Sequence, residues 1–324
     1  MVSFHCSREA LPGGFVGVDL FFVLSGFLIS SILLEEHART GTIALGRFYL
    51  RRAMRLWPAL VLMLAAYLVA APLVFPQASA GRDALLAGLY LSDYSQAFWH
   101  LPYLPLLHTW SLSVEEHFYL LWPAAVLLLA RFDRRAAIAM LVGVFLIVSL
   151  WRMIDLAIWR SFTTTFYRFD TRMSGLVLGS LIAFLPWRPK TAAANMFAAA
   201  GAAIIAWAMV SLDWGTASPL LAAGVAVDFG AGCTVLALAA GGSFLGRVLT
   251  FRPLAYIGMI SYSIYLWHYP VVVAMRDTPS SPLSIRESIV VIVASFVLAA
   301  TSYELLEKPL KAYRYRRYAV SAAE

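Results

Sequence analysis

The chain has 324 residues, of which 61% are hydrophobic and only 13% charged, and its mean hydropathy is +0.76. A typical globular domain is about a quarter charged, so this composition excludes a soluble globular protein. The formal net charge of +7 comes largely from basic residues beside apolar segments, a pattern of membrane topology rather than of nucleic-acid binding. The two cysteines, Cys6 and Cys233, provide neither a disulfide framework nor a metal site.

Apolar segments follow one another along the chain and predict an all-α polytopic membrane protein with about nine transmembrane helices. A helix needs about 20 apolar residues to cross a bilayer, and the segment 136–151 is shorter than that. We expect one integral membrane domain over residues 1–311 and a basic cytoplasmic tail over 312–324. The predicted spans are 16–34, 57–75, 110–130, 136–151, 173–187, 192–211, 218–240, 257–274 and 286–306.

The positions of arginine and lysine predict the orientation of these spans. If the 35–56 loop lies inside and the nine segments alternate, most of the 25 basic residues fall on the inner side, as the positive-inside rule requires. The basic runs 47–55 and 131–135 both lie inside, so residues 76–109 must cross the membrane an even number of times. We therefore expect 83–98 to be re-entrant or to lie on the outer face. The same parity places His5 outside and predicts a further helix before it.

An arginine cluster lies where the chain enters the membrane from the predicted inner side, in RFYLRRAMRLWP at 47–58. Such a cluster serves as a topological anchor in many membrane proteins. It is also suited to phosphate groups, which guanidinium groups bind through paired hydrogen bonds. Arg51, Arg52 and Arg55 lie near one helical face, which suits a multiply charged ligand from the cytoplasm.

Two adjacent glutamates, Glu115 and Glu116, stand early in the apolar segment 110–130. Acidic residues in a first helical turn interact favourably with the helix dipole, and a preceding serine can cap the helix. A carboxylate buried by neighbouring helices is otherwise a candidate proton acceptor or substrate anchor. Both interpretations fit the sequence.

Further polar residues occur at the ends of two other predicted spans. Arg168, Asp170 and Arg172 are predicted at the outer mouth of a span, where they form a structural ion pair or line a substrate cavity. His268 ends a run of serines and tyrosines and suits packing at the interface as well as a cavity. The acid–base segment 304–308 reads as an inner cap and anchor.

Several stretches together resemble the bacterial membrane acyltransferase-3 family, integral membrane O-acyltransferases that modify surface glycans. They occur in family order and cover nearly the whole chain. The matching stretches are PGGFVGVDLFFVLSGFLIS (12–30), RFYLRRAMRLWP (47–58), HTWSLSVEEHFYLLWP (108–123), RFDTRMSGLVLGSLIA (168–183), ISYSIYLWHYP (260–270) and YELLEKPLK (303–311).

This resemblance implies a ten-helix domain in the bacterial inner membrane that moves an acyl group, acetyl in particular, from cytoplasmic acyl-CoA. The acceptor would be a hydroxyl of an extracytoplasmic glycan or glycoside, such as a surface carbohydrate or a lipid-linked glycan. Acetyl-CoA would be a co-substrate, and we expect no metal and no tightly bound cofactor. Membrane lipids are the other expected partners, and nucleic acid is not.

The resemblance also assigns site residues. The family's essential histidine falls on His5, which we expect to act as general base or as transient acyl carrier. Asp19 is then placed to hold the His5 imidazole in the useful tautomer, as a carboxylate does in a catalytic triad. Without the family motif, His5 would read as a terminal residue and Asp19 as a cap. The family's remaining motifs fall on Ser25, Gly26, Arg51, Arg52, Arg55, Glu115 and Glu116.

Two other classes of function fit parts of the sequence. A transporter or flippase for a glycan or small molecule also has polar residues and broken helices within the membrane, although no internal repeat is visible. An anchor or assembly subunit would not need CoA at its arginine cluster. The sequence leaves open which surface polysaccharide, peptidoglycan, lipid-linked glycan or secreted glycoside is the acceptor.

Overall fold

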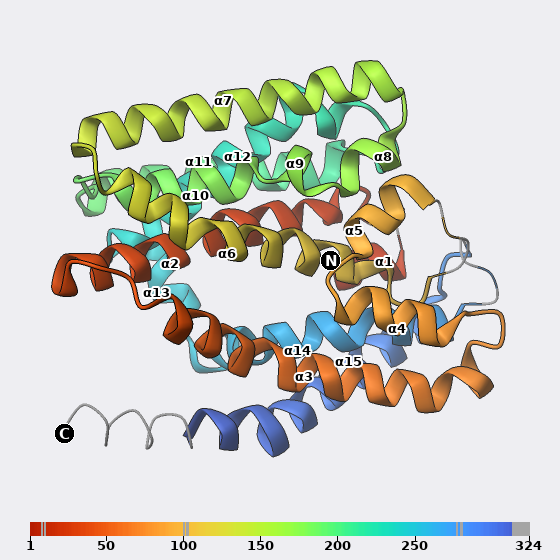
Figure 1. The fold of residues 1–324 in the computed structure, drawn as a ribbon. Coiled ribbons are helices and arrows are strands. Elements are labelled where there is room, and N and C mark those ends of the chain that lie inside the picture. Colours follow the sequence, from red (N-terminus) through yellow and green to blue (C-terminus); the bar gives the residue numbers. More distant parts are fainter. Residues whose placement is uncertain are drawn as a thin grey trace.

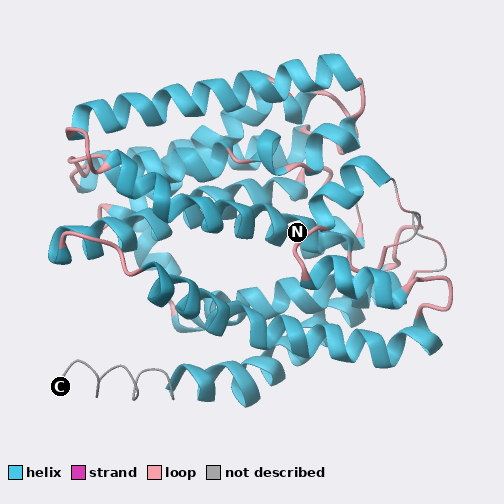
Figure 2. Cartoon of the chain, viewed as in Figure 1, coloured by secondary structure: helices cyan, strands magenta, loops and turns pink. Residues whose placement is uncertain are grey.

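The computed structural model describes residues 1–7, 9, 11–99, 101, 104–276, 278 and 281–312. Every regular element in these ranges is a helix, so the predicted all-α fold is confirmed (Figure 2). The predicted basic tail lies outside the described residues apart from Ala312.

The helices are of two kinds, long ones that form the bundle and short ones that connect them. The long helices are α2 (Gly17–Thr40), α3 (Leu45–Val74), α6 (Trp110–Leu129), α7 (Arg134–Trp159), α10 (Ser174–Phe184), α11 (Thr191–Ser211), α12 (Ala222–Ala239), α14 (Arg252–Ala274) and α15 (Ile285–Ser302). The short ones are α1 (Val2–Cys6), η1 (Gly14–Val16), α4 (Ala80–Gly88), α5 (Ser92–Tyr94), η2 (Ser95–Trp99), η3 (Leu107–Thr109), α8 (Phe162–Tyr167), α9 (Phe169–Arg172), η4 (Ser218–Leu220), α13 (Phe244–Leu249) and η5 (Tyr303–Glu307).

Eight helices of the described ranges are long and apolar enough to cross a membrane, and the shorter α10 occupies the remaining predicted segment, 173–187. With 11 residues, α10 is only about 16 Å long, roughly half of a hydrocarbon core. The chain reaches it through α8 and α9, which are separated by Arg168 in an extended conformation. The predicted span 173–187 is therefore the last part of a broken helix, a form that membrane proteins tolerate where protein buries the break.

The predicted span 136–151 is too short, because α7 continues to Trp159. Two charged residues, Arg152 and Asp155, interrupt the apolar pattern after position 151, yet both side chains are buried in the bundle. Arg152 lies 3.8 Å from Asp228 of α12, and Asp155 accepts a hydrogen bond from Arg168 at 2.7 Å. Because partners on other parts of the chain neutralise these charges, the helix continues through them.

The long helices run back and forth between two ends of the molecule (Figure 1). The turns after α2 and α6 lie at one end, and the turns after α3 and α7 lie at the other. Between α3 and η3 the described residues form only short helices, so the predicted absence of a crossing span at 83–98 is confirmed. Helices α3, α14 and α15 form one group, and α2, α6, α7, α10, α11 and α12 form another (Figure 1).

Two glycines allow α2 and α10 to pack with their backbones in contact. A Cβ atom added to Gly26 would lie 1.9 Å from the carbonyl oxygen of Leu176, and one added to Gly179 would lie 1.9 Å from that of Val23. Small residues bring membrane helices this close and strengthen their van der Waals contact. The pair fixes α10 beside α2, and thereby places the residues before α10 near the start of α2.

Candidate active site

A cavity of about 260 Å³ lies where the two groups of helices meet near the start of the chain. Two histidines line it, His5 of α1 and His108 of η3, together with Tyr269 of α14. Gln96 and Arg276 add polar groups to the wall. The rest of the wall is largely aromatic and contains Phe4, Phe15, Trp110, Phe166, Tyr167 and Trp214. We call this space the histidine cavity.

A third histidine, His268 of α14, completes a buried cluster at this cavity. Its ring centre lies 5.4 Å from that of His5 and 5.5 Å from that of His108. The Tyr269 ring contacts both outer imidazoles, with centre distances of 4.8 Å to His5 and 5.3 Å to His108. Segments separated by more than a hundred residues therefore bring three imidazoles together, and the predicted residues His5 and His268 are among them.

Backbone carbonyl groups fix the tautomers of two of these histidines. The Nδ1 atom of His268 lies 2.7 Å from the carbonyl oxygen of Tyr265 and 3.2 Å from that of Ile264. The Nε2 atom of His108 lies 3.1 Å from the carbonyl oxygen of Leu266. A carbonyl oxygen only accepts, so each of these nitrogens carries the proton and donates. The other nitrogen of each ring is then an acceptor, and in the described part of the chain it has no hydrogen-bond partner.

The expectation that Asp19 holds the His5 ring is wrong in this structure. The Arg172 Nη2 atom donates to Asp19 Oδ1 at 2.6 Å, and both side chains are buried. Arg172 also stacks on the Phe166 ring, with its guanidinium carbon 4.4 Å from the ring centre. A buried carboxylate is stabilised more by a cation than by a neutral imidazole. Asp19 therefore pairs with Arg172, which the α2–α10 packing brings beside it.

Replacing Arg172 by Met is expected to destabilise the protein by roughly 3–5 kcal/mol, because Asp19 is left as an unpaired buried charge. Thermal unfolding of the purified variant in detergent measures the effect. The double replacement Asp19→Asn with Arg172→Met removes both charges and should recover much of the loss. Unfolding of Arg172→Met at the wild-type temperature would contradict this role of the ion pair.

Arg168 and Asp170 form the structural ion pair that the sequence offered as one interpretation. Arg168 donates from Nη1 to Asp155 at 2.7 Å and from Nε to Asp170 at 2.9 Å. Trp151 donates to the same Asp170 carboxylate at 2.7 Å. Arg168 and Asp170 are thus bonded to each other and to neighbouring side chains of α7. Neither side chain, nor that of Arg172, lines the histidine cavity.

The predicted glutamates belong to a separate polar cluster deeper along α6. Tyr119 donates to Glu115 at 2.6 Å and is hydrogen-bonded to Ser25 of α2. The Arg52 guanidinium lies over the Tyr119 ring, 3.7 Å from its centre, so it faces the glutamates. Glu115 lies seven residues beyond His108, or about 10 Å along the helix. The glutamate cluster is therefore separate from the histidines.

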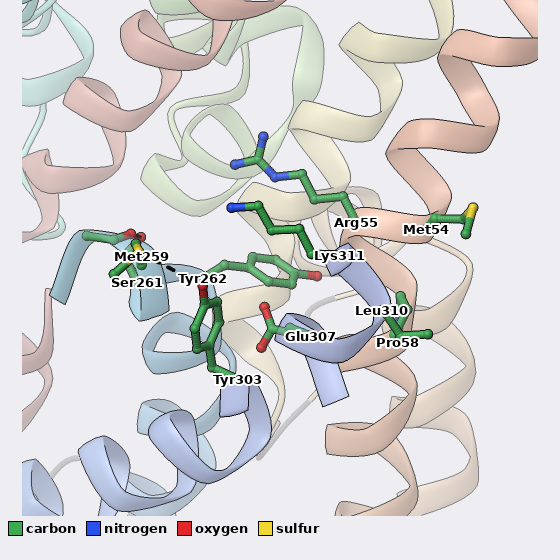
Figure 3. Close-up of a pocket in the computed structure, with 11 residues that line it drawn as sticks. Met54, Arg55, Pro58, Met259, Ser261, Tyr262, Tyr303, Glu307, Leu310 and Lys311 are labelled. Carbon is green, nitrogen blue, oxygen red and sulfur yellow. Dashed lines mark hydrogen bonds between the residues drawn. The ribbon is translucent and has the colours of Figure 1, made fainter. Parts of the chain in front are cut away.

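A second hollow, which we call the arginine pocket, has a volume of about 360 Å³ and lies between α3, α14 and the end of the last helix. Arg55 and Lys311 extend into the same space, and Tyr262, Tyr303 and Glu307 complete its polar lining (Figure 3). Of the three predicted CoA-binding arginines, Arg55 alone lines this pocket.

Arg52 therefore does not share a site with Arg55. Neighbouring residues of a helix point about 100° apart. This rotation turns Arg52 towards Tyr119 and leaves the side chain of Arg51 exposed. Glu307 also differs from its expected role as an inner cap, because it is hydrogen-bonded to Ser263 at the pocket wall.

His108, Tyr269 and Lys311 were not among the predicted site residues. One signal in the sequence points to His108. If the spans alternate, the start of the segment 110–130 and the end of 257–274 lie at the same side as His5. The sequence contains no such signal for Lys311. Only the packing of the last helix against α3 places this side chain beside Arg55.

Comparison with known proteins gives one family. A family model described as an acyltransferase domain matches residues 2–304. The chain is 29% identical to the peptidoglycan O-acetyltransferase OatA of Listeria monocytogenes, 31% to the O-acetyltransferase OatA of Staphylococcus aureus and 30% to the putative peptidoglycan O-acetyltransferase YrhL of Bacillus subtilis. Each alignment covers 98% of this chain and 54% to 56% of the relative. No solved structure matches the chain.

The chain thus spans about half the length of the curated relatives it matches, and the family match covers nearly all of it. The stretches that carry the resemblance include the segments that hold Arg55 and His268, and the family match also includes His5. The chain belongs to this family of membrane acyltransferases, the acyltransferase-3 family.

Proposed function

We propose that the protein is an O-acetyltransferase that takes acetyl from acetyl-CoA at the inner face of the bacterial cell membrane and transfers it to a hydroxyl of an extracytoplasmic glycan. The observation that carries this proposal is the histidine cavity, which is lined by His5, the residue that the resemblance equates with the family's essential histidine. The Listeria relative is named a peptidoglycan O-acetyltransferase and the Bacillus relative a putative one, which makes a peptidoglycan-type sugar the first acceptor to test.

The arginine pocket is the proposed place for the CoA phosphates. Arg55 and Lys311 provide two positive charges at the end of the bundle that the charge distribution predicts to be cytoplasmic. The neighbouring rings of Tyr262 and Tyr303 offer flat surfaces to an adenine base. This arrangement matches a ligand that is anionic at one part and aromatic at another.

Helix α14 connects the arginine pocket with the histidine cavity. Tyr262 lines the first and Tyr269 lines the second. Seven residues separate them, which corresponds to about 10 Å along the helix. If the CoA phosphates bind at the arginine pocket, the extended arm of acetyl-CoA would run along α14 and bring its thioester towards His5.

Two π-helical turns contribute to the walls of these spaces. The turn Ser95–Trp99 brings Gln96 to the histidine cavity, and the turn Tyr303–Glu307 brings its first and last residues to the arginine pocket. Turns of this kind insert an extra residue into a helix and occur frequently at functional sites. Their presence at both spaces supports a functional role for both.

The proposed chemistry uses the neutral imidazole of His5 as general base. His5 takes the proton of the acceptor hydroxyl as its oxygen attacks the thioester carbon. The carbon–sulfur bond then breaks, the acetyl group remains on the acceptor oxygen, and the imidazolium returns the proton to the CoA thiolate. If His5 carries the acetyl group first, the same bonds form and break in two steps.

Purified protein in liposomes tests the proposal directly. With acetyl-CoA and a peptidoglycan fragment, release of CoA thiol and a mass increase of one acetyl group on the fragment are expected. Glycan movement across the bilayer without consumption of acetyl-CoA would overturn the proposal and favour the transporter alternative. Release of thiol without acetylated fragment would retain the donor assignment and reject this acceptor.

Replacing Arg55 by Ala or Lys311 by Ala is expected to raise the KM for acetyl-CoA about tenfold each, because a charge-assisted hydrogen bond to phosphate is lost. Initial rates over a range of acetyl-CoA concentrations measure this change. Lys308→Ala is the matched control, since Lys308 stands on the same helix but pairs with Glu304 at 2.6 Å. An unchanged KM in both pocket variants would remove CoA from the arginine pocket.

A further inference from the structure

A histidine base must be held in one orientation and one tautomer, and the group expected to hold His5 is engaged elsewhere. Asp19 is paired with Arg172 in the described structure. Arg276 donates to the backbone carbonyl of His5, at 2.5 Å, and this contact does not orient the imidazole. A different side chain must therefore fix the His5 ring if it acts as the proposed base.

His268 is the side chain with the required geometry. It is fully buried, and its ring centre lies 5.4 Å from that of His5 with the two planes tilted by 41°. A hydrogen bond between ring nitrogens spans about 3 Å, so rings at this separation can bond directly after a change of His5 orientation. The contact joins α1 to α14, so a conformational change at α14 would reach the base directly.

The tautomer of His268 makes it an acceptor towards His5. Because Nδ1 donates to the carbonyl groups of Tyr265 and Ile264, the lone pair lies on Nε2. This Nε2 atom is buried and has no hydrogen-bond partner among the described residues, and the same holds for His5 Nε2. A buried polar atom left unpaired is costly, so this acceptor, on a ring that lies beside two other imidazoles, calls for a donor.

We propose that His268 is the positioning residue of the reaction: its Nε2 atom accepts the ring N–H of His5 and turns the other His5 nitrogen to the acceptor hydroxyl. This inference rests on the proposed function of His5. When His5 takes the hydroxyl proton, its N–H becomes a stronger donor and the bond to His268 strengthens, which stabilises the imidazolium. A neutral acceptor can do this inside a membrane protein without the desolvation cost of a second carboxylate.

Two amide variants of His268 separate positioning from packing. In His268→Asn the amide nitrogen can still donate to the Tyr265 carbonyl, as Nδ1 does, but nothing replaces the acceptor Nε2. In His268→Gln the longer side chain places an amide oxygen near the position of Nε2, so an acceptor for His5 is kept. A role in packing alone predicts equal effects of the two variants.

We expect His268→Asn to lower kcat about a hundredfold with little change in the KM for acetyl-CoA, and His268→Gln to retain activity within about tenfold of the wild type. Acetyl transfer in liposomes measures both, and gel filtration in detergent with acetyl-CoA binding shows that each variant is folded. His37→Asn, at the end of α2 and outside both pockets, is the matched histidine control.

Wild-type kcat in folded His268→Asn would overturn the positioning role, and so would equal losses in the Asn and Gln variants. These results would leave the proposed function intact, provided that His5→Ala is inactive. Absence of acetyl transfer by the wild-type protein, or full activity of His5→Ala, would instead reject the proposed function itself. The two failures are therefore distinguishable in one set of assays.

Discussion

Replacing His5 by Ala is expected to lower kcat for acetyl transfer by about 10²–10⁴, the usual contribution of a general base. His5 lines the cavity with a buried nitrogen that has no hydrogen-bond partner among the described residues, so its removal eliminates the proposed proton acceptor. If His5 carries the acetyl group, the loss is complete. Steady-state rates in liposomes, with acetyl-CoA binding measured separately, test this expectation.

Membrane insertion and acetyl-CoA binding should be unchanged in His5→Ala, because Arg55 and Lys311 at the arginine pocket are not altered. His5→Gln keeps the approximate size of the side chain and serves as a second variant in case alanine loosens α1. Activity of folded His5→Gln and His5→Ala at the wild-type level would show that the reaction does not use this imidazole.

Replacing Gly26 by Ala is expected to destabilise the protein by about 3 kcal/mol or more, the upper end of what overpacking costs. The added methyl group would lie 1.9 Å from the carbonyl oxygen of Leu176, and that atom belongs to the backbone of α10. The backbone cannot rotate away as a side chain can, so α2 and α10 must separate and lose contact along their length. The thermal unfolding temperature and the yield of monodisperse protein in detergent measure the effect.

Gly143→Ala provides the matched control for this stability prediction. Gly143 lies in the middle of α7, and an added methyl group would meet nothing within 4 Å. Alanine is the better helix former by up to about 1 kcal/mol, so this variant should be as stable as the wild type or slightly more stable. Equal unfolding temperatures of Gly26→Ala and Gly143→Ala would show that α2 and α10 do not need the close contact.

Features that depend on one helix at a time could be predicted from the sequence. Apolar length alone locates the long helices, and the parity of the basic runs correctly leaves residues 83–98 without a crossing span. The apolar pattern places the end of the span 136–151 too early. Arg152 and Asp155 look like solvent-exposed charges until their partners are known. An apolar pattern cannot reveal a buried ion pair whose partner is distant in the chain.

The candidate site shows the same division between local and tertiary information. The family motif identifies His5, but the groups around it come from η3 and α14, more than a hundred residues away. Helical spacing groups Arg51, Arg52 and Arg55, yet packing turns Arg52 to Tyr119 and leaves Arg55 beside Lys311. Spacing therefore predicted which residue types matter and did not predict their partners.

Apolar length and ordered motifs are properties of the linear chain, so the sequence alone identifies a membrane-embedded helical member of the acyltransferase-3 family. The pairing of Asp19 with Arg172 and the contact of His268 with His5 depend on how the helices pack. The reason is physical: helical periodicity sets the face on which a side chain lies. Which partner this side chain contacts depends on how closely α2, α10 and α14 pack. Glycines such as Gly26 set the distance between α2 and α10.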